Sequence, residues 1–128
     1  MKMQPDRLDG VNMISRWEGS RLWVHQTRFD HSVLVPHRGL VQPWAPTDMA
    51  SLNAEAFEAV VALKPELVIF GSGSGLVFPS PALWAPLVSR GIGFEAMDSA
   101  AACRTYNVLA SEGRAVLAAL LLGGETGG

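Results

Sequence analysis

Short apolar runs separated by turn residues occupy the first third of the chain. Residues 21–29, 32–35 and 40–41 are rich in Trp, Val, Leu and Phe, and the sequences Asp-His and Pro-His-Arg-Gly interrupt them. Apolar runs of this length between turn residues are typical of antiparallel strands. The pattern therefore predicts β-hairpins in this region.

The middle of the chain changes to helical spacing. Residues 53–65 repeat apolar side chains every three to four positions, which predicts a helix with Asn53 as its N-cap and Pro65 at its end. The run Glu-Leu-Val-Ile-Phe-Gly at residues 66–71 is short, continuous and apolar. Such a run predicts a strand that is buried on both faces.

A second helix is predicted over residues 80–91. Ser80 stands at the N-cap position and Pro81 at the first helical position, a favourable start for a helix. Pro86 lies inside the helix, where it removes one backbone hydrogen bond. We therefore expect a kink or a short 3₁₀ turn at this position.

The last third of the chain predicts one strand and one long helix. Residues 93–98 form a second strand, and residues 99–122 are helical to the end, with Ser99 as a cap and a break near residues 111–113. Strand, helix and strand over residues 66–98 make a βαβ unit, whose strands are expected to be parallel. The predicted class is α/β.

Size and composition are those of one globular domain. The chain has 128 residues, of which 48% are hydrophobic and 17% charged. This is enough apolar material for one core. We place the domain at residues 8–122 and expect flexible tails at residues 1–7 and 123–128, which are polar and glycine-rich respectively.

Charge and cysteine content narrow the classes of function. The formal net charge is -2 and no Lys/Arg run occurs, which argues against nucleic-acid binding. The single cysteine excludes an internal disulfide and fits a reducing compartment. The first ten residues carry no apolar signal segment, and the apolar run near the end is too short to span a bilayer. We expect a soluble cytoplasmic protein that is not inserted in a membrane.

A glycine-rich loop follows the buried strand, and it suggests two interpretations. The loop consists of Gly71, Ser72, Gly73, Ser74 and Gly75. It has no Walker lysine, and its third glycine stands one position early for a dinucleotide fingerprint. Glycines here can simply let the chain turn. Alternatively, the backbone N–H groups form a nest for a small anion or carboxylate, beside the helix that begins near Ser80.

A ligand site, if the domain has one, is expected at the carboxyl ends of the parallel strands. This places the glycine loop opposite Asp98, Ser99 and the first turns of the last helix. The hypothetical ligand-binding residues, in addition to the loop, are Asp98, Ser99, Cys103, Arg104, Tyr106 and Asn107.

Two of these residues also have ordinary structural interpretations. Asp98 precedes a helix and can cap it. Cys103 shares a helix face with Asn107 and Ala110, which indicates packing more than nucleophilic catalysis. The three histidines lack partners for a metal set. We assign no catalytic residue, no metal and no cofactor.

The second half of the chain resembles a known family of small domains of unknown function. The features that carry the resemblance are the strand and glycine loop leading to Phe-Pro, the sequence Arg-Gly-Ile-Gly-Phe-Glu, and the sequences Ala-Ala-Ala-Cys-Arg-Thr-Tyr-Asn and Ser-Glu-Gly-Arg. Eukaryotic relatives in that family include a mitochondrial factor for the assembly of respiratory complex I and an adipogenesis-associated protein.

The resemblance implies three layers, a central mixed sheet and an additional N-terminal β element. It also implies a non-catalytic binding or assembly role with a protein partner, because it supplies no catalytic residues. The alternative is a small-molecule or anion-binding protein or enzyme that uses residues 71–75 with Asp98 and Cys103. A third interpretation is a homo-oligomer that pairs through an exposed apolar surface.

Overall fold

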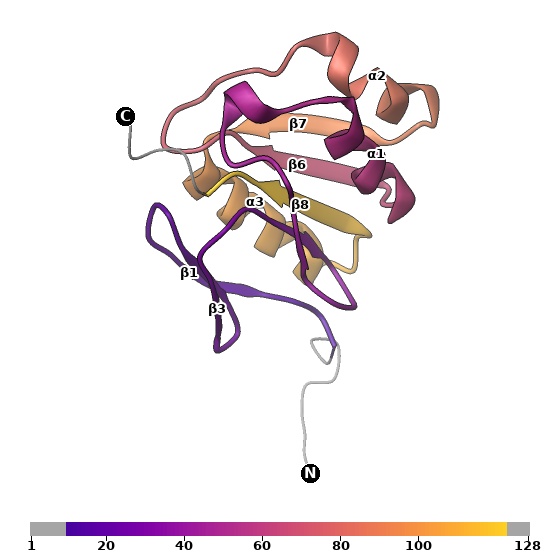
Figure 1. Ribbon diagram of the computed structural model, residues 1–128. Coiled ribbons are helices and arrows are strands. Elements are labelled where there is room, and N and C mark those ends of the chain that lie inside the picture. Colours follow the sequence, from indigo (N-terminus) through magenta and orange to yellow (C-terminus); the bar gives the residue numbers. More distant parts are fainter. Residues whose placement is uncertain (1–9, 123–128) are drawn as a thin grey trace.

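The computed structural model describes residues 10–122 and contains a central five-stranded mixed sheet (Figure 1). Its strands lie in the spatial order β5-β4-β8-β6-β7. In chain order they are β4 (Val33–Pro36), β5 (Gln42–Pro43), β6 (Leu67–Gly71), β7 (Gly93–Met97) and β8 (Val116–Leu120). β6 runs parallel to β7 and β8, whereas β4 is antiparallel to β5 and β8. The predicted βαβ unit with parallel strands is confirmed.

Helices cover both faces of this sheet. The helices are α1 (Ala54–Ala62) and α2 (Pro81–Ser89) on one face and α3 (Ser99–Ser111) on the other (Figure 1). Alternate residues of β8 point to opposite sides: Leu117 lies in the same apolar core as Phe57 of α1, and Ala118 lies in the other core with Tyr106 of α3. The sheet therefore separates two apolar cores, and the predicted three-layer α/β class is confirmed.

A second, smaller sheet packs on the α3 side. It contains β1 (Ile14–Trp17), β2 (Leu22–Val24) and β3 (Thr27–Phe29), all antiparallel. Ile14, Leu22 and Val24 are buried in the same core as Tyr106. This sheet is the additional N-terminal element that was predicted, although β1 itself was missed. A 3₁₀ helix, η2 (Met49–Ser51), precedes α1.

The prediction that the helix continues to the end of the chain is wrong. α3 ends at Ser111, because Gly113 takes a positive φ of 86° and its N–H donates to the Ala110 carbonyl at 3.0 Å. This glycine closes the last turn and reverses the chain. The following Ala/Leu-rich run becomes β8, the central strand, with all five residues buried. Pairing with β4 and β6 outweighs its helical propensity.

The predicted helix ends were partly right. The Asn53 side chain accepts from the Ala56 N–H at 2.9 Å and caps α1 as expected. Ser80 makes no side-chain cap hydrogen bond, although Pro81 begins α2 as predicted. α2 is α-helical through Pro86, so the expected 3₁₀ turn is absent from this helix.

The limits of the domain stay a prediction. The expected flexible tails, residues 1–7 and 123–128, lie outside the described residues.

Candidate functional site

The glycine loop begins with a close contact between β6 and α3. A Cβ atom at Gly71 would lie 2.7 Å from Ser99 Oγ and 2.8 Å from Leu120 Cδ2. Real Cβ atoms do not approach other atoms so closely, so only glycine fits here without rearrangement. Gly71 thus lets the end of β6 lie directly on the start of α3.

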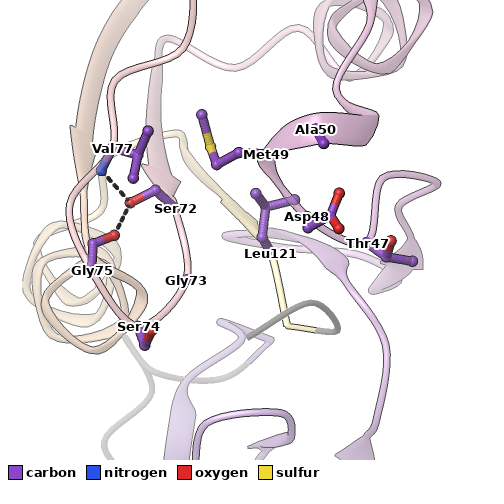
Figure 2. A pocket seen from close by; sticks show the side chains of 10 residues that line it. All are labelled: Thr47, Asp48, Met49, Ala50, Ser72, Gly73, Ser74, Gly75, Val77 and Leu121. Atoms are coloured by element: carbon purple, nitrogen blue, oxygen red, sulfur yellow. Dashed lines mark hydrogen bonds between the residues drawn. The ribbon is translucent and has the colours of Figure 1, made fainter. Parts of the chain in front are cut away.

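Hydrogen bonds then tie the loop to itself and to α3. The Ser72 hydroxyl donates to the Gly75 carbonyl at 2.6 Å and accepts from the Val77 N–H at 3.0 Å (Figure 2). Gly73, with a φ of 108°, donates its N–H to Ser99 Oγ at 3.0 Å, and its carbonyl accepts from the Ser99 N–H at 2.8 Å. Several loop amides are therefore already bound to protein acceptors.

A pocket of about 290 Å³ lies between this loop and the segment before α1 (Figure 2). Its lining residues are Thr47, Asp48, Met49, Ala50, Ser72, Gly73, Ser74, Gly75, Val77 and Leu121. Asp48 is the charged residue among them, and its carboxylate accepts from the Ser51 N–H at 3.0 Å. A carboxylate in the pocket opposes the binding of an anion by the loop.

Asp98 and Ser99 lie where the sequence analysis placed them, beside the loop. Asp98 is the N-cap of α3, because its Oδ1 accepts from the Ala101 N–H at 2.8 Å. Ser99 is the first helical residue and not the cap that was expected. Its hydroxyl is fully buried and also donates to the Leu121 carbonyl at 3.2 Å. Both side chains thus have structural partners.

Cys103 and Arg104 lie one turn further along α3. Burial raises the pKa of the Cys103 thiol to about 12, and the nearby Arg104 only partly opposes this shift. A thiol with so high a pKa is protonated at neutral pH and is a weak nucleophile. Both residues border a second hollow of about 250 Å³ between α3 and β1.

Tyr106 and Asn107 point toward the N-terminal sheet. The Tyr106 hydroxyl lies 2.7 Å from the Asn12 carbonyl and 3.0 Å from the Pro36 carbonyl, and burial raises the pKa of this hydroxyl. The Asn107 side chain accepts from the Ile14 N–H at 2.9 Å and donates to the Ile14 carbonyl at 2.8 Å. Asn107 therefore attaches β1 of the small sheet to α3, whereas Tyr106 links α3 to the segment before β1 and to the end of β4. Neither residue lines the pocket beside the glycine loop.

An exposed apolar surface follows the glycine loop, and sequence reasoning missed it. Leu76, Val77 and Phe78, which we call the apolar loop surface, are 54%, 47% and 70% exposed. The available signal was three consecutive apolar residues between Gly75 and Pro79, in a segment too short for another strand.

A groove lies beside this surface, along strand β7. It measures about 330 Å³ and is lined by Phe78, Trp84, Phe94, Glu95 and Ala96; we call it the edge groove. The Trp84 ring stacks on Phe94 with centroids 4.6 Å apart, and Trp84 Nε1 donates to the Pro79 carbonyl at 3.3 Å. These contacts hold the aromatic wall of the edge groove in one orientation.

The sheet and its covering helices define a small three-layer α/β domain with a closed glycine loop and an exposed apolar edge. The chain belongs to the family described as "Protein of unknown function (DUF498/DUF598)", whose model matches residues 14–121. A solved structure from Bordetella parapertussis is similar, with 34% identity and a TM-score of 0.83 over 88% of this chain and 97% of that chain. The predicted family resemblance is confirmed.

Similar proteins occur in bacteria and in mammals. An uncharacterised protein of Rhodobacter capsulatus is 37% identical over 69% of this chain and 67% of its own length. Assembly factor 3 of the NADH dehydrogenase [ubiquinone] 1 alpha subcomplex, from Mus musculus, is 33% identical over 73% of this chain. The match spans 50% of the mouse protein. The "13 kDa major membrane protein" of Francisella tularensis is 20% identical over 91% of this chain and 95% of its own length.

Residues 10–122 contain neither a membrane-spanning helix nor a metal-binding cluster. In this range, every helix is too short or too polar to cross a bilayer. The same residues contain no cluster of three His, Cys, Asp or Glu side chains suited to a metal ion.

Proposed function

We propose that this protein is a non-catalytic assembly module that binds a protein partner through the apolar loop surface. The observation that carries the proposal is the exposure of Leu76, Val77 and Phe78 beside the edge groove. Adjacent exposed apolar side chains of this size mark interaction sites more often than single ones do. The name of the mouse relative, an assembly factor, supports the same role.

The chemistry of the other candidate residues favours binding over catalysis. Asp98 caps α3, and the Cys103 thiol is buried with a raised pKa of about 12. Asn107 bonds β1 of the N-terminal sheet, and the Tyr106 hydroxyl bonds the carbonyls of Asn12 and Pro36. These side chains are used within the fold, whereas Phe78 is 70% exposed and lines the edge groove.

The test is capture of partners from the native cells by the tagged protein, with chemical crosslinking and quantitative mass spectrometry. The variant is Phe78→Ser, and the matched control is Leu40→Ser, which alters an apolar side chain that is 83% exposed near the opposite edge of the sheet. Burying a Phe side chain contributes about 1.5–3 kcal/mol, so Phe78→Ser should weaken a partner contact by roughly 10- to 100-fold.

The proposal predicts a protein that wild type and Leu40→Ser retain equally and that Phe78→Ser loses. Equal capture by all three forms, or no specific capture by the wild type, would overturn it. Thermal melting of each variant checks that all three are folded. Recovery of the chain itself as the captured protein would support the homo-oligomer interpretation instead.

A further inference from the structure

Strand β7 forms one edge of the five-stranded sheet, and its register shows which backbone groups face outward. The N–H of Gly93 donates to the Glu66 carbonyl at 3.0 Å, and the carbonyl of Met97 accepts from the Ser72 N–H at 2.9 Å. In a parallel ladder, alternate residues direct both backbone groups to the same neighbour. The backbone N–H and C=O groups of Gly93, Glu95 and Met97 therefore face β6. Those of Phe94 and Ala96 point away from β6, toward the open edge.

These outward groups are two donors and two acceptors without a partner strand. Among residues 10–122, β7 pairs only with β6, and no hydrogen bond links the Phe94 or Ala96 backbone to another element. The strand is less buried than its neighbour, with Glu95 exposed and Phe94 and Ala96 half-buried. An open edge of this kind is a template for another strand.

The edge groove lies beside this open edge. Phe94 and Ala96 pack on the α1/α2 side of the sheet, which is also the side of Trp84. A strand added outside β7 would place every second side chain on this side, next to Trp84 and the 70% exposed Phe78. An apolar side chain there would be removed from water by aromatic rings.

The negative charge of Glu95 determines which kind of chain can pair with β7. A second copy could pair its β7 antiparallel to this one and use all four outward groups, if Phe94 lay opposite Ala96 of the copy. That register places Glu95 opposite the Glu95 of the copy in a close pair, with Cα atoms about 4.5 Å apart. Like charges in such a position are destabilising, so the edge favours a different chain with a basic side chain opposite Glu95.

We propose that β7 binds an extended segment of a partner protein by strand addition. The segment carries Lys or Arg opposite Glu95, flanked on each side by an apolar residue that enters the edge groove. The Phe94 and Ala96 backbones supply the hydrogen bonds. This inference rests on the proposed function and specifies how that partner is recognised.

The test is selection of a phage-displayed library of random dodecapeptides on the purified full chain. Selected peptides are then measured by fluorescence anisotropy against wild type and variants. Ala96→Pro removes an outward N–H and leaves the ladder to β6 intact, because proline is tolerated where a strand's N–H faces solvent. Ala96→Val is the matched control, since it keeps that N–H.

Strand addition predicts peptides enriched in apolar–Lys/Arg–apolar triplets. They should bind Ala96→Pro at least about ten-fold more weakly than Ala96→Val, and Glu95→Lys should shift the preference to an acidic central residue by about five-fold. In NMR spectra, the bound peptide should protect the Phe94 and Ala96 amides from exchange.

Two results separate this inference from the proposed function. Peptides that bind Ala96→Pro as well as Ala96→Val, but lose affinity for Phe78→Ser, would overturn strand addition and leave the apolar loop surface as the binding site. Peptides that none of these variants affects, or a selection that enriches no peptide, would also overturn strand addition, whereas the proposed function is overturned only by the capture experiment with Phe78→Ser.

Discussion

Replacing Gly71 with alanine should destabilise the domain strongly. The added Cβ would lie 2.7 Å from Ser99 Oγ, 2.8 Å from Leu120 Cδ2 and 3.0 Å from Ser99 Cα. The Ser99 backbone cannot move away easily, because Ser99 is the first residue of α3 and its N–H donates to the Gly73 carbonyl at 2.8 Å. Leu120 belongs to the fully buried central strand. The steric conflict therefore involves parts of the structure that are fixed on both sides.

The cost can be worked from these contacts. Forcing an extra methyl group into a packed core costs about 1–3 kcal/mol. Displacing the Ser99 hydroxyl also weakens its hydrogen bonds to the Gly73 N–H and the Leu121 carbonyl, each contributing about 1 kcal/mol. We expect a loss of roughly 2–4 kcal/mol in the free energy of unfolding.

Urea denaturation followed by tryptophan fluorescence measures this loss. With an m-value of about 1.5 kcal/mol/M, the midpoint should fall by roughly 1.3–2.7 M. Gly75→Ala is the matched control, since it lies in the same loop, has no positive φ and meets nothing within 4 Å of an added Cβ. Its effect should stay within about 0.5 kcal/mol. Equal midpoints for the two variants would refute the packing argument.

Three further predictions concern the edge strand, the thiol and the small sheet. In hydrogen exchange measured by NMR, the outward-facing amides of Phe94 and Ala96 should exchange at least about ten-fold faster than those of Glu95 and Met97 in the free protein. Equal exchange rates would contradict the register between β6 and β7. Burial raises the pKa of Cys103 to about 12, so the free energy of unfolding should fall as the pH rises from 9 toward 12. Urea titrations of Cys103→Ala should show a weaker fall over this pH range. An unchanged pH dependence would refute the raised pKa of this thiol. Asn107→Ala removes both hydrogen bonds to Ile14 and should cost about 2 kcal/mol. Limited proteolysis should then cut residues 14–29 faster than in Val108→Ala, an exposed neighbour on the same helix, and equal rates would count against this role.

Local signals explain which parts of the fold could be predicted. The N-cap at Asn53, the proline at Pro81 and the apolar run before Gly71 each act within a few residues, and all three marked an element correctly. The sequence of β8 carries no such signal. Its alanines and leucines favour a helix, and the run becomes a strand because β4 and β6 lie on either side of it.

The candidate site likewise has features that could be predicted from the sequence and others that depend on residues distant in the chain. A parallel sheet brings the carboxyl ends of its strands to one edge, so the meeting of Gly73 and Ser99 could be predicted from strand order alone. The roles of Tyr106 and Asn107 could not, because their partners Asn12 and Ile14 lie more than 90 residues away in the chain. The three apolar residues between Gly75 and Pro79 are too few to show periodicity, so the exposure of Phe78 could not be predicted from them.

In our proposal, the hydrogen-bonded glycine loop and the unpaired edge of β7 contribute to one binding surface. The bonds of Ser72 to Gly75 and Val77, and of Gly73 to Ser99, fix the base of the segment that ends at Phe78. Trp84 fixes the other end through the Pro79 carbonyl. A binding surface held in this way loses little conformational freedom when a partner binds, so more of the contact energy appears as affinity. The glycine loop then serves recognition without touching the ligand, because it holds Phe78 beside the unpaired edge of β7.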